Sequence, residues 1–270
     1  MPPNTEKPDC WLNAFAKNYF SQFGEDGILE RIFEVIPDID RWCVEFGAWD
    51  GKHLSNTCNR ILSHGYAAVL FESHPRRFQE LQSNYAQSPR TITFRQAVGF
   101  GPEDNLDRLL EQTQIPWTFD LLSIDIDGND YHVWDAVQKY RPKVVVIEFN
   151  PTVSDSLEFV QEKNINVMHG SSLLALVRLG RRKQYELVAT TFCNALFVDS
   201  CYFPLFGIRD NSIGQLRSDN SAVSYLFYGF DGTVMLRGSR NMLWHGLPLD
   251  ERMMQVLPQH LRQYPDNYND

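Results

Sequence analysis

Two pairs of oxygen-bearing side chains have a spacing that suits a divalent cation. Asp125 and Asp127 stand two residues apart at the end of one apolar segment, and Glu148 and Asn150 repeat this spacing at the end of the next. Residues i and i+2 of a strand point to the same face of a sheet, and Mg²⁺ prefers carboxylate and other oxygen ligands. The pattern predicts a metal site made by all four. In the alternative interpretation, Asp125 contacts a cofactor and the others make polar contacts in a substrate pocket.

A glycine-containing turn and a later acid form a second candidate site. VEFGAWDG (44–51) carries the turn, and the residues of interest are Glu45, Gly47, Asp50, Gly51 and, closing the next apolar segment, Glu72. Glycine lets a backbone approach a ligand closely, and an acid about 25 residues later can accept the hydroxyl groups of a ribose. Asp50 would repel a diphosphate but suits a cationic nucleoside without phosphate. The pattern predicts S-adenosyl-L-methionine (SAM) as the cofactor, and NAD is the less favoured occupant.

Transfer of a methyl group from SAM to a hydroxyl oxygen requires removal of a proton, so a base or a metal is expected. Three histidines are candidate bases: His53, His132 and His169. We rank His169 first, together with Asp127, because the long connection that precedes it is expected to overhang the strand ends. A carboxylate acceptor needs only cationic groups to position it, for which Arg178, Arg209 and Arg217 are candidates; each also reads as a solvated surface charge.

The segments that position these residues alternate between two kinds. Predicted strands cover 42–46, 67–72, 91–98, 119–126, 143–149, 185–191 and 194–200, and predicted helices cover 24–36, 54–65, 75–86, 103–113, 131–140 and 171–183. Such alternation favours parallel βαβ units, and uniformly apolar strands indicate a sheet covered on both faces. Only two residues separate the last two strands, which forces an antiparallel pair.

The chain divides into three parts. Residues 1–18 are expected to form a tail or loosely docked arm, 19–203 the SAM-binding domain, and 204–270 an extension. The extension is expected to contain a hairpin over 224–238, around Asp231-Gly232, and a short helix over 250–261 that is broken near Pro258, followed by a polar tail. Its aromatic residues favour a lid over the acceptor or a subunit contact, so a homodimer is a hypothesis.

Composition narrows the classes of partner. The 270 residues carry 25 basic and 34 acidic side chains, a net charge of −9, with a pI near 5.3. This balance argues against binding to nucleic acid or to an anionic membrane, which need a basic surface. The five cysteines have no C-x-x-C spacing, and no signal peptide or membrane-spanning stretch is recognised. We expect a cytoplasmic protein that acts on a small molecule.

The motifs together resemble the FkbM-like group of class I SAM-dependent methyltransferases. The resemblance covers about residues 19–200 and rests on SQFGEDGILERIF (21–33), VEFGAWDG (44–51), LSNT (54–57), Glu72, SIDIDGND (123–130), VVVIEFNP (144–151) and HGSSLLAL (169–176). It implies a Rossmann-like α/β fold with a seven-stranded, mostly parallel sheet whose last strand is antiparallel. Trp49 departs from the smaller residue that is usual in the turn. The four oxygen ligands are also placed as in metal-dependent small-molecule O-methyltransferases.

The resemblance also implies roles in cofactor binding. Glu45 and Gly47 would frame the methionine end of SAM, with Asp50 and the backbone of Gly51 beside it. Ser55 or Asn56 would reach the SAM carboxylate, and Glu72 the ribose hydroxyls. Gln96, Ala97 and Val98 would flank the adenine, and Asp125 would contact the cofactor. Ser21, Gln22 and Glu25 would close the site from the N-terminal side, or else cap a helix.

The function predicted from these residues is SAM-dependent O-methylation of a small metabolite at a hydroxyl or carboxyl oxygen, with Mg²⁺ as a candidate metal. A small (di)carboxylic acid methylated to its ester is a narrower form of this hypothesis. Two alternatives remain open: an NAD-dependent oxidoreductase, which would use the same glycine turn and Glu72, and a non-catalytic Rossmann-like interaction module. Acids that converge at strand ends argue against the module, because their mutual repulsion is costly without a function.

Overall fold

The computed structural model describes residues 8–264, which form two compact units. One unit comprises residues 8–150 and 155–218, and the other comprises 151–154 and 219–264. Residues 1–7 of the predicted arm and 265–270 of the predicted tail lie outside the described residues. Each unit is described by itself.

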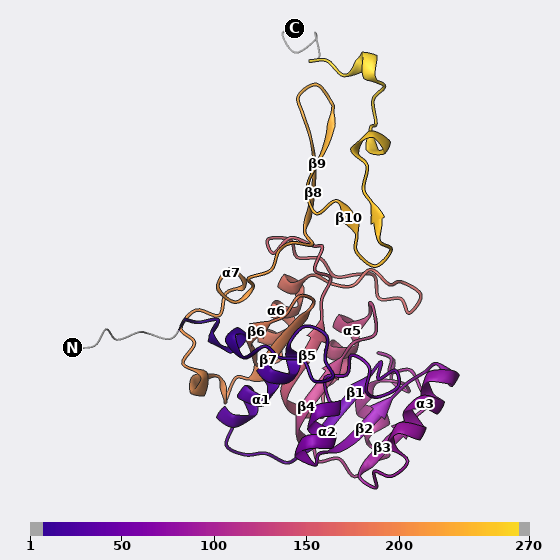
Figure 1. Cartoon of the computed structure of the whole chain (residues 1–270), viewed down its shortest axis with the longest axis vertical. Helices are drawn as coiled ribbons and strands as arrows, with labels where there is room; N and C mark the ends of the chain where they lie inside the picture. The colour runs from indigo at the N-terminus through magenta and orange to yellow at the C-terminus, as the bar shows by residue number, and fades with distance from the viewer. Residues whose placement is uncertain (1–7, 265–270) are drawn as a thin grey trace, which may run out of the picture. The chain divides into compact units, whose positions relative to one another are not determined.

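The larger unit is built on one seven-stranded sheet (Figure 1). Its strands are β1 Trp42–Phe46, β2 Ala67–Phe71, β3 Thr91–Phe94, β4 Thr118–Ile124, β5 Arg141–Glu148, β6 Tyr185–Thr190 and β7 Asn194–Asp199. Their order is β3-β2-β1-β4-β5-β7-β6, and β7 is antiparallel to both of its neighbours. This is the Rossmann-like class I methyltransferase fold, so the predicted fold class is confirmed.

Helices cover both faces of this sheet because neighbouring residues along each strand point to opposite sides. The helices are α1 Glu25–Val35, α2 Cys58–His64, α3 Pro75–Tyr85, α4 Leu106–Leu110, α5 Asp130–Ala136, α6 Leu173–Arg182 and α7 Ile213–Leu216. In β1, Val44 and Phe46 join the core formed with α4, α5 and α6, whereas Cys43 joins the core formed with α1, α2 and α3. The strand ends are therefore fixed from both sides.

The N-terminal segment is more firmly attached than predicted. Trp11–Phe15 forms a 3-10 helix, η1, whose Trp11 and Leu12 are buried in the α1 core. The Trp11 indole nitrogen donates a hydrogen bond to the carbonyl oxygen of Phe206, at 3.1 Å. Residues 8–18 are thus attached to the larger unit, because the side chains of Trp11 and Leu12 are buried in its core.

The larger unit also continues past residue 203, where the sequence predicted its end. A 3-10 helix, η2 Phe203–Phe206, and the short α7 follow β7. Phe206 and Leu216 are buried, and the Leu216 carbonyl accepts a hydrogen bond from the Thr190 hydroxyl at 3.0 Å. These contacts carry the unit to residue 218.

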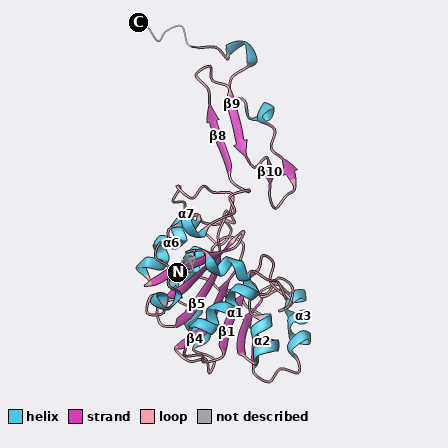
Figure 2. Ribbon diagram, turned by 60° about the vertical axis from the view of Figure 1, so that its left-hand side comes forward, coloured by secondary structure: helices cyan, strands magenta, loops and turns pink. Residues whose placement is uncertain are grey.

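The smaller unit is built on the predicted hairpin (Figure 2). Strands β8 Ser224–Tyr228 and β9 Val234–Gly238 are antiparallel, and the Asp231 carboxylate accepts the Thr233 amide in the turn at 3.0 Å. A short pair, β10 Asn241–Met242 and β11 Leu247–Pro248, follows. In place of the α-helix predicted over 250–261 the structure has two 3-10 turns, η3 Glu251–Met254 and η4 Gln259–Leu261. They lie on either side of Pro258, where the sequence predicts the break.

Among the described residues, no helix combines the length and apolarity needed to cross a bilayer.

Candidate active site

The turn after β1 lies directly against the end of β4. Gly47 has φ +72°, and a Cβ added to it would lie 1.8 Å from the carbonyl oxygen of Asp125. Only glycine fits such a position. Because β1 has β2 on one side and β4 on the other, this turn marks the point at which strand order reverses, where ligands bind in open α/β sheets.

Glu72 holds the same turn from the neighbouring strand. Its carboxylate accepts the Trp49 amide at 2.9 Å and the His74 amide at 2.6 Å, while the Ala48 amide bonds to the Phe71 carbonyl at 3.0 Å. A carboxylate has about four acceptor positions, so two amides leave capacity for a ligand. Glu72 thus lies at the predicted rim beside the turn, where it shapes the turn as well.

Trp49 is the exposed side chain of the turn. Its φ of +51° turns the backbone, and 44% of its surface is exposed. The Arg77 guanidinium carbon lies 4.1 Å from a Trp49 ring centroid, a cation–π contact that holds the indole in place. The Asp50 carboxylate accepts the amides of Lys52 and His53 and closes the next turn. The unusual tryptophan therefore forms an ordered aromatic wall on the rim.

Glu45, in contrast, faces the interior. Its carboxylate accepts hydrogen bonds from the Ser55 hydroxyl (2.6 Å), the Thr57 hydroxyl (2.7 Å) and the Asn56 amide (2.8 Å). Burial raises the pKa of Glu45, and these hydrogen bonds oppose that rise. The predicted helix over 54–65 starts only at Cys58 because Glu45 binds the preceding LSNT segment.

Ser55 and Asn56, predicted to reach the SAM carboxylate, make contacts within the chain. Both are buried, and the Asn56 side-chain nitrogen donates to the Ser123 hydroxyl at 3.1 Å. Their polar groups bind other parts of the chain, so they hold the turn region together. Gly51 is also buried, and a Cβ there would meet Tyr85 and Leu81.

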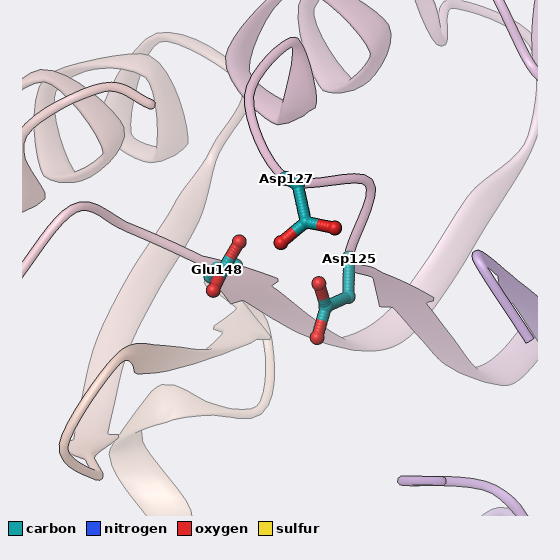
Figure 3. A group of neighbouring side chains, drawn as sticks. All are labelled: Asp125, Asp127 and Glu148. Carbon is teal, nitrogen blue, oxygen red and sulfur yellow. The ribbon is translucent and has the colours of Figure 1, made fainter. Parts of the chain in front are cut away.

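Three acids converge at the ends of β4 and β5 (Figure 3). One carboxylate oxygen from each of Asp125, Asp127 and Glu148 lies within 4.8 Å of the others. Asp127 has φ +57°, which turns its side chain back toward the strand ends. Asp130 follows at the start of α5, where it accepts the amides of Ile126 and Gly128, both at 2.9 Å.

The cluster is electrostatically strained. Burial, and then the neighbouring Asp125, Asp130 and Asp127, raise the pKa of Glu148 to about 10. Burial followed by Asp130 and Asp127 raises the pKa of Asp125 well above its usual range. Burial also raises the pKa of Asp130 to about 6, against the effect of its backbone hydrogen bonds. In the described residues, no lysine or arginine forms an ion pair with any of the four, so the site favours a cation or a proton.

Asn150 and His169 are brought together beside this cluster. The Asn150 side-chain nitrogen donates to the His169 carbonyl at 2.8 Å, which ties the long connection to the end of β5. Gln161 accepts the His169 amide at 3.0 Å. Of the other candidate bases, His132 is buried with its Nε2 bonded to the Gln161 carbonyl, and the His53 ring lies 6.1 Å from that of Trp49. His169 alone of the three is joined to the acid-bearing strand end by its main chain.

The N-terminal motif borders the same strand ends. Glu25 is buried and accepts hydrogen bonds from the Thr191 hydroxyl at 2.5 Å and the Asn194 side chain at 3.0 Å. Asn194 pairs with Glu148 across β5 and β7. Ser21 is buried, and its hydroxyl donates a hydrogen bond to Asn18 Oδ1, whereas Gln22 is exposed.

At the other edge, β3 ends at Phe94, earlier than predicted. Gln96 and Ala97 are exposed beyond it, and Val98 is buried in the core. Gln96 and Ala97 are therefore accessible to solvent beyond the end of β3, whereas the Val98 side chain packs inward.

No protein-family model and no curated protein sequence matches the chain. Solved structures do match. The glycopeptide N-methyltransferase MtfA in complex with SAM is 12% identical; the match covers 67% of this chain and 94% of MtfA, with a TM-score of 0.39. The N-terminal domain of EvdMO1 with S-adenosyl-L-homocysteine (SAH) bound is 11% identical over 67% of this chain and 82% of that domain, with a TM-score of 0.42. A precorrin-6y C5,15-methyltransferase from Geobacter metallireducens GS-15 is 12% identical over 68% and 92%, with a TM-score of 0.40. At such low sequence identities and TM-scores, these matches assign no role to any residue of this chain.

Sequence reasoning missed three participants in the site. Asp130 adds a fourth acid, and Thr191 and Asn194 hold Glu25 beside Glu148. The run of acids in SIDIDGND was a signal for Asp130. Thr191 and Asn194 lie in the link and strand of the hairpin, and only the β5–β7 register brings them to the rim.

The strained cluster predicts a pH-dependent stability. The pKa of Glu148 is near 10 in the folded chain, against an ordinary value of 4.5, so folding takes up a proton. Stability therefore falls as the pH rises from about 4.5 toward about 10. Glu148→Gln, which mimics the protonated acid, should raise the free energy of unfolding of the chelator-treated protein at about pH 8 by roughly 1 kcal/mol or more, and by little near pH 4. Urea unfolding at the two pH values measures this, with the exposed Glu103→Gln as the matched control. An equal effect at both pH values would contradict it.

Proposed function

We propose that this chain is a SAM-dependent methyltransferase that acts on a small molecule. The observation that carries this proposal is the arrangement at the switch point: the Gly47 turn lies against the end of β4, and Glu72 closes the adjacent strand. This arrangement leaves an approach for a nucleoside whose ribose reaches Glu72. The acidic turn residue Asp50 and the acids beyond β4 favour a cationic ligand over a dinucleotide.

We further propose membership of the FkbM-like group. In support, the motif residues have defined local roles: Asp26 accepts the amides of Tyr19, Phe20 and Ser21, and Glu45 holds the LSNT segment. The motifs on which the resemblance rests thus form loops that border the candidate site.

The proposed reaction is transfer to an oxygen. The acceptor oxygen attacks the methyl carbon, the carbon–sulfur bond breaks with its electron pair remaining on sulfur, and a hydroxyl acceptor releases its proton to a base. The enzyme's main contribution is to hold oxygen, carbon and sulfur in line, an effect worth about 7–11 kcal/mol at best. Asp127 is the exposed carboxylate of the cluster and the residue best placed to receive the proton, with His169 as the second candidate.

A hydroxyl acceptor fits this site better than a carboxylic acid. An anionic acceptor would be repelled by each acid of the cluster that is ionised, and it would add to the negative charge that already raises the pKa values of Asp125 and Glu148. An esterified (di)carboxylic acid would need its charge balanced by a cation at the cluster.

The donor set fits a hard divalent cation such as Mg²⁺. Asp125, Asp127 and Glu148 supply three carboxylate oxygens within mutual reach, and Asn150 stands at the same strand end. A bound divalent cation would lower the pKa of an acceptor hydroxyl. The chain's own acids would orient the acceptor and, by their burial, exclude water from the reacting atoms.

Calorimetric titration tests the proposal directly. We expect saturable binding of SAM and SAH and none of NADH, followed by formation of SAH when the protein and SAM are mixed with a panel of small hydroxylated acceptors. Binding of NADH in place of SAM would favour an oxidoreductase, and binding of neither would favour the non-catalytic module.

Glu72→Ala is expected to weaken SAH binding about tenfold, because the ribose hydroxyls lose a charged acceptor. Removing a ribose hydroxyl from the ligand separates this role from an indirect effect on the turn. Wild-type protein should bind 2′-deoxy-SAH more weakly than SAH, whereas Glu72→Ala should bind the two equally. If the variant still discriminates between them, Glu72 does not contact that hydroxyl.

A further inference from the structure

The hairpin of the smaller unit has an open edge along β8. In an antiparallel pair, successive residues direct their backbone N–H and C=O groups alternately toward the partner strand and away from it. The Gly229 amide bonds to the Thr233 carbonyl at 2.9 Å, so the odd-numbered residues of β8 direct their backbone groups toward β9. The backbone groups of Ser224, Leu226 and Tyr228 therefore point outward, away from β9.

The chain blocks the other edge of the hairpin. On β9 the Val234 amide donates to the Gln255 side-chain oxygen at 3.0 Å, and the Gln255 side-chain nitrogen donates to the Val234 carbonyl at 2.9 Å. The Leu236 carbonyl accepts the Arg237 guanidinium at 2.7 Å. In this unit β9 lies between β8 and η3 (Figure 2). Over residues 8–264, no hydrogen bond reaches the outward backbone groups of β8, and such an edge is a template for another strand.

The side chains of β8 are apolar and uncovered on both faces of the hairpin. On one face Leu226 is 62% exposed, whereas Leu236, its neighbour on β9, is 2% exposed. Tyr228 on the same face and Tyr225 and Phe227 on the other are exposed as well. Edge strands are commonly protected by charged side chains, proline or a bulge, and β8 has none of these. The uncovered surface of the hairpin is therefore that of β8.

The smaller unit buries little apolar surface of its own. Its buried apolar side chains are Ala222, Val223, Val234 and Leu236, and none of them joins either core cluster of the larger unit. A two-stranded hairpin is marginally stable in water, and three or more strands are needed for independent stability. A further strand at the open edge would supply this.

We propose that β8 pairs antiparallel with β8 of a second copy of this chain, about a two-fold axis at Leu226. The outward backbone groups of Leu226 would then bond to those of Leu226 of the partner subunit, and those of Ser224 to those of Tyr228. On the other face, Tyr225 would lie beside Phe227 of the partner subunit, a favourable aromatic cross-strand pair. The result is a four-stranded sheet in the order β9-β8-β8-β9.

Charge favours a second copy as the occupant of this edge. The whole chain has a net charge of −9, which makes two copies repel each other. Residues 219–264, in contrast, carry four acids and four arginines, and β8 carries no charge. Pairing at β8 therefore brings the copies together through their neutral part and places no like charges opposite each other.

The area available indicates a reversible dimer. The exposed parts of the three aromatic side chains of β8 and of Leu226 amount to roughly 400 Å² per copy. A standard stable interface buries about 800 Å² per partner. The backbone hydrogen bonds add to the apolar contact, but the dimer is expected to dissociate on dilution.

Sedimentation equilibrium of the full chain tests the proposal. The mean mass of the wild type should rise from 31.3 kDa toward twice that value as the concentration is raised from about 1 μM to about 500 μM. Leu226→Lys alone and Leu226→Glu alone should stay near 31.3 kDa, because like charges would face each other across the axis. An equal mixture of the two should dimerise about tenfold or more tightly than either alone. Met253→Lys, at an exposed residue of η3, is the matched control and should associate as wild type does.

The results separate this interface from other occupants of the edge. Position 226 is exposed in the single chain, so each variant should keep the wild-type melting temperature at about 1 μM, where the dimer is dissociated. The proposal is overturned if the wild type stays at 31.3 kDa throughout, which would assign the edge to another segment of this chain or to a different protein. It is also overturned if Leu226→Lys associates like the wild type, or if the mixture associates no better than its components. No measurement here uses SAM or turnover, so failure leaves the methyltransferase proposal standing.

Discussion

Asp127→Ala is expected to lower the rate of SAH formation by about 10²–10⁴-fold, the range for loss of a positioned proton acceptor. Asp127 is the exposed acid of the cluster, and its turn aims it at Asp125 and Glu148 (Figure 3). As base or as metal ligand, it acts on the acceptor and not on the cofactor. The affinity for SAM in calorimetry should therefore stay close to that of wild type while turnover is lost.

Two controls make this result decisive. Glu103→Ala removes an exposed carboxylate outside the cluster and should leave turnover unchanged. Excess chelator distinguishes the two roles of Asp127. If the wild type loses turnover in chelator and Mg²⁺ restores it, Asp127 acts as a metal ligand. If the wild type keeps full turnover in chelator, the metal hypothesis is excluded and Asp127 acts as the base. Wild-type turnover by Asp127→Ala would exclude both roles.

Much of the larger unit could be predicted from the sequence because its signals are local. Apolar runs such as KVVVIEF (143–149) can be buried on both faces only in a covered sheet. The link between the last two strands, predicted as two residues and three in the structure, is short enough to permit only a hairpin. Once parallel strands are inferred, their carboxyl ends share one edge. The convergence of Asp125, Asp127 and Glu148 then follows from topology alone.

The features that sequence reasoning missed depend on contacts between distant segments. The LSNT segment (54–57) is predicted as the start of a helix. In the structure its Ser55 and Thr57 hydroxyls and its Asn56 amide donate hydrogen bonds to the buried Glu45 carboxylate, and the helix begins later. From the sequence, Arg60 is predicted to be an ordinary charge on a helix surface. Only the packing of α1 and Tyr66 around it shows that it is buried. Residues 204–218 carry no strong periodicity, and only their contacts with η1 and β6 attach them to the core.

Glu45→Ala is expected to lower the free energy of unfolding by about 3–5 kcal/mol, as for removal of one partner from a buried charged network. The substitution leaves the Ser55 and Thr57 hydroxyls and the Asn56 amide without their acceptor. Of these, the backbone amide is the most costly to leave unpaired, since it cannot turn toward another partner. Urea unfolding measures the loss, with Glu103→Ala as the control.

Glu45→Gln separates this structural role from contact with the methionine end of SAM. A glutamine can place its oxygen on the Asn56 amide while the hydroxyls of Ser55 and Thr57 rotate to accept its nitrogen, so the variant should be destabilised less than Glu45→Ala. If Glu45 acts only from the interior, folded Glu45→Gln should bind SAM with wild-type affinity. If it contacts the cofactor's ammonium group instead, loss of the negative charge should weaken SAM binding about tenfold at unchanged stability. Three hydrogen bonds already occupy most of the acceptor positions of this buried carboxylate. They favour the first result, which would make Glu45 a residue that builds the site without touching the ligand.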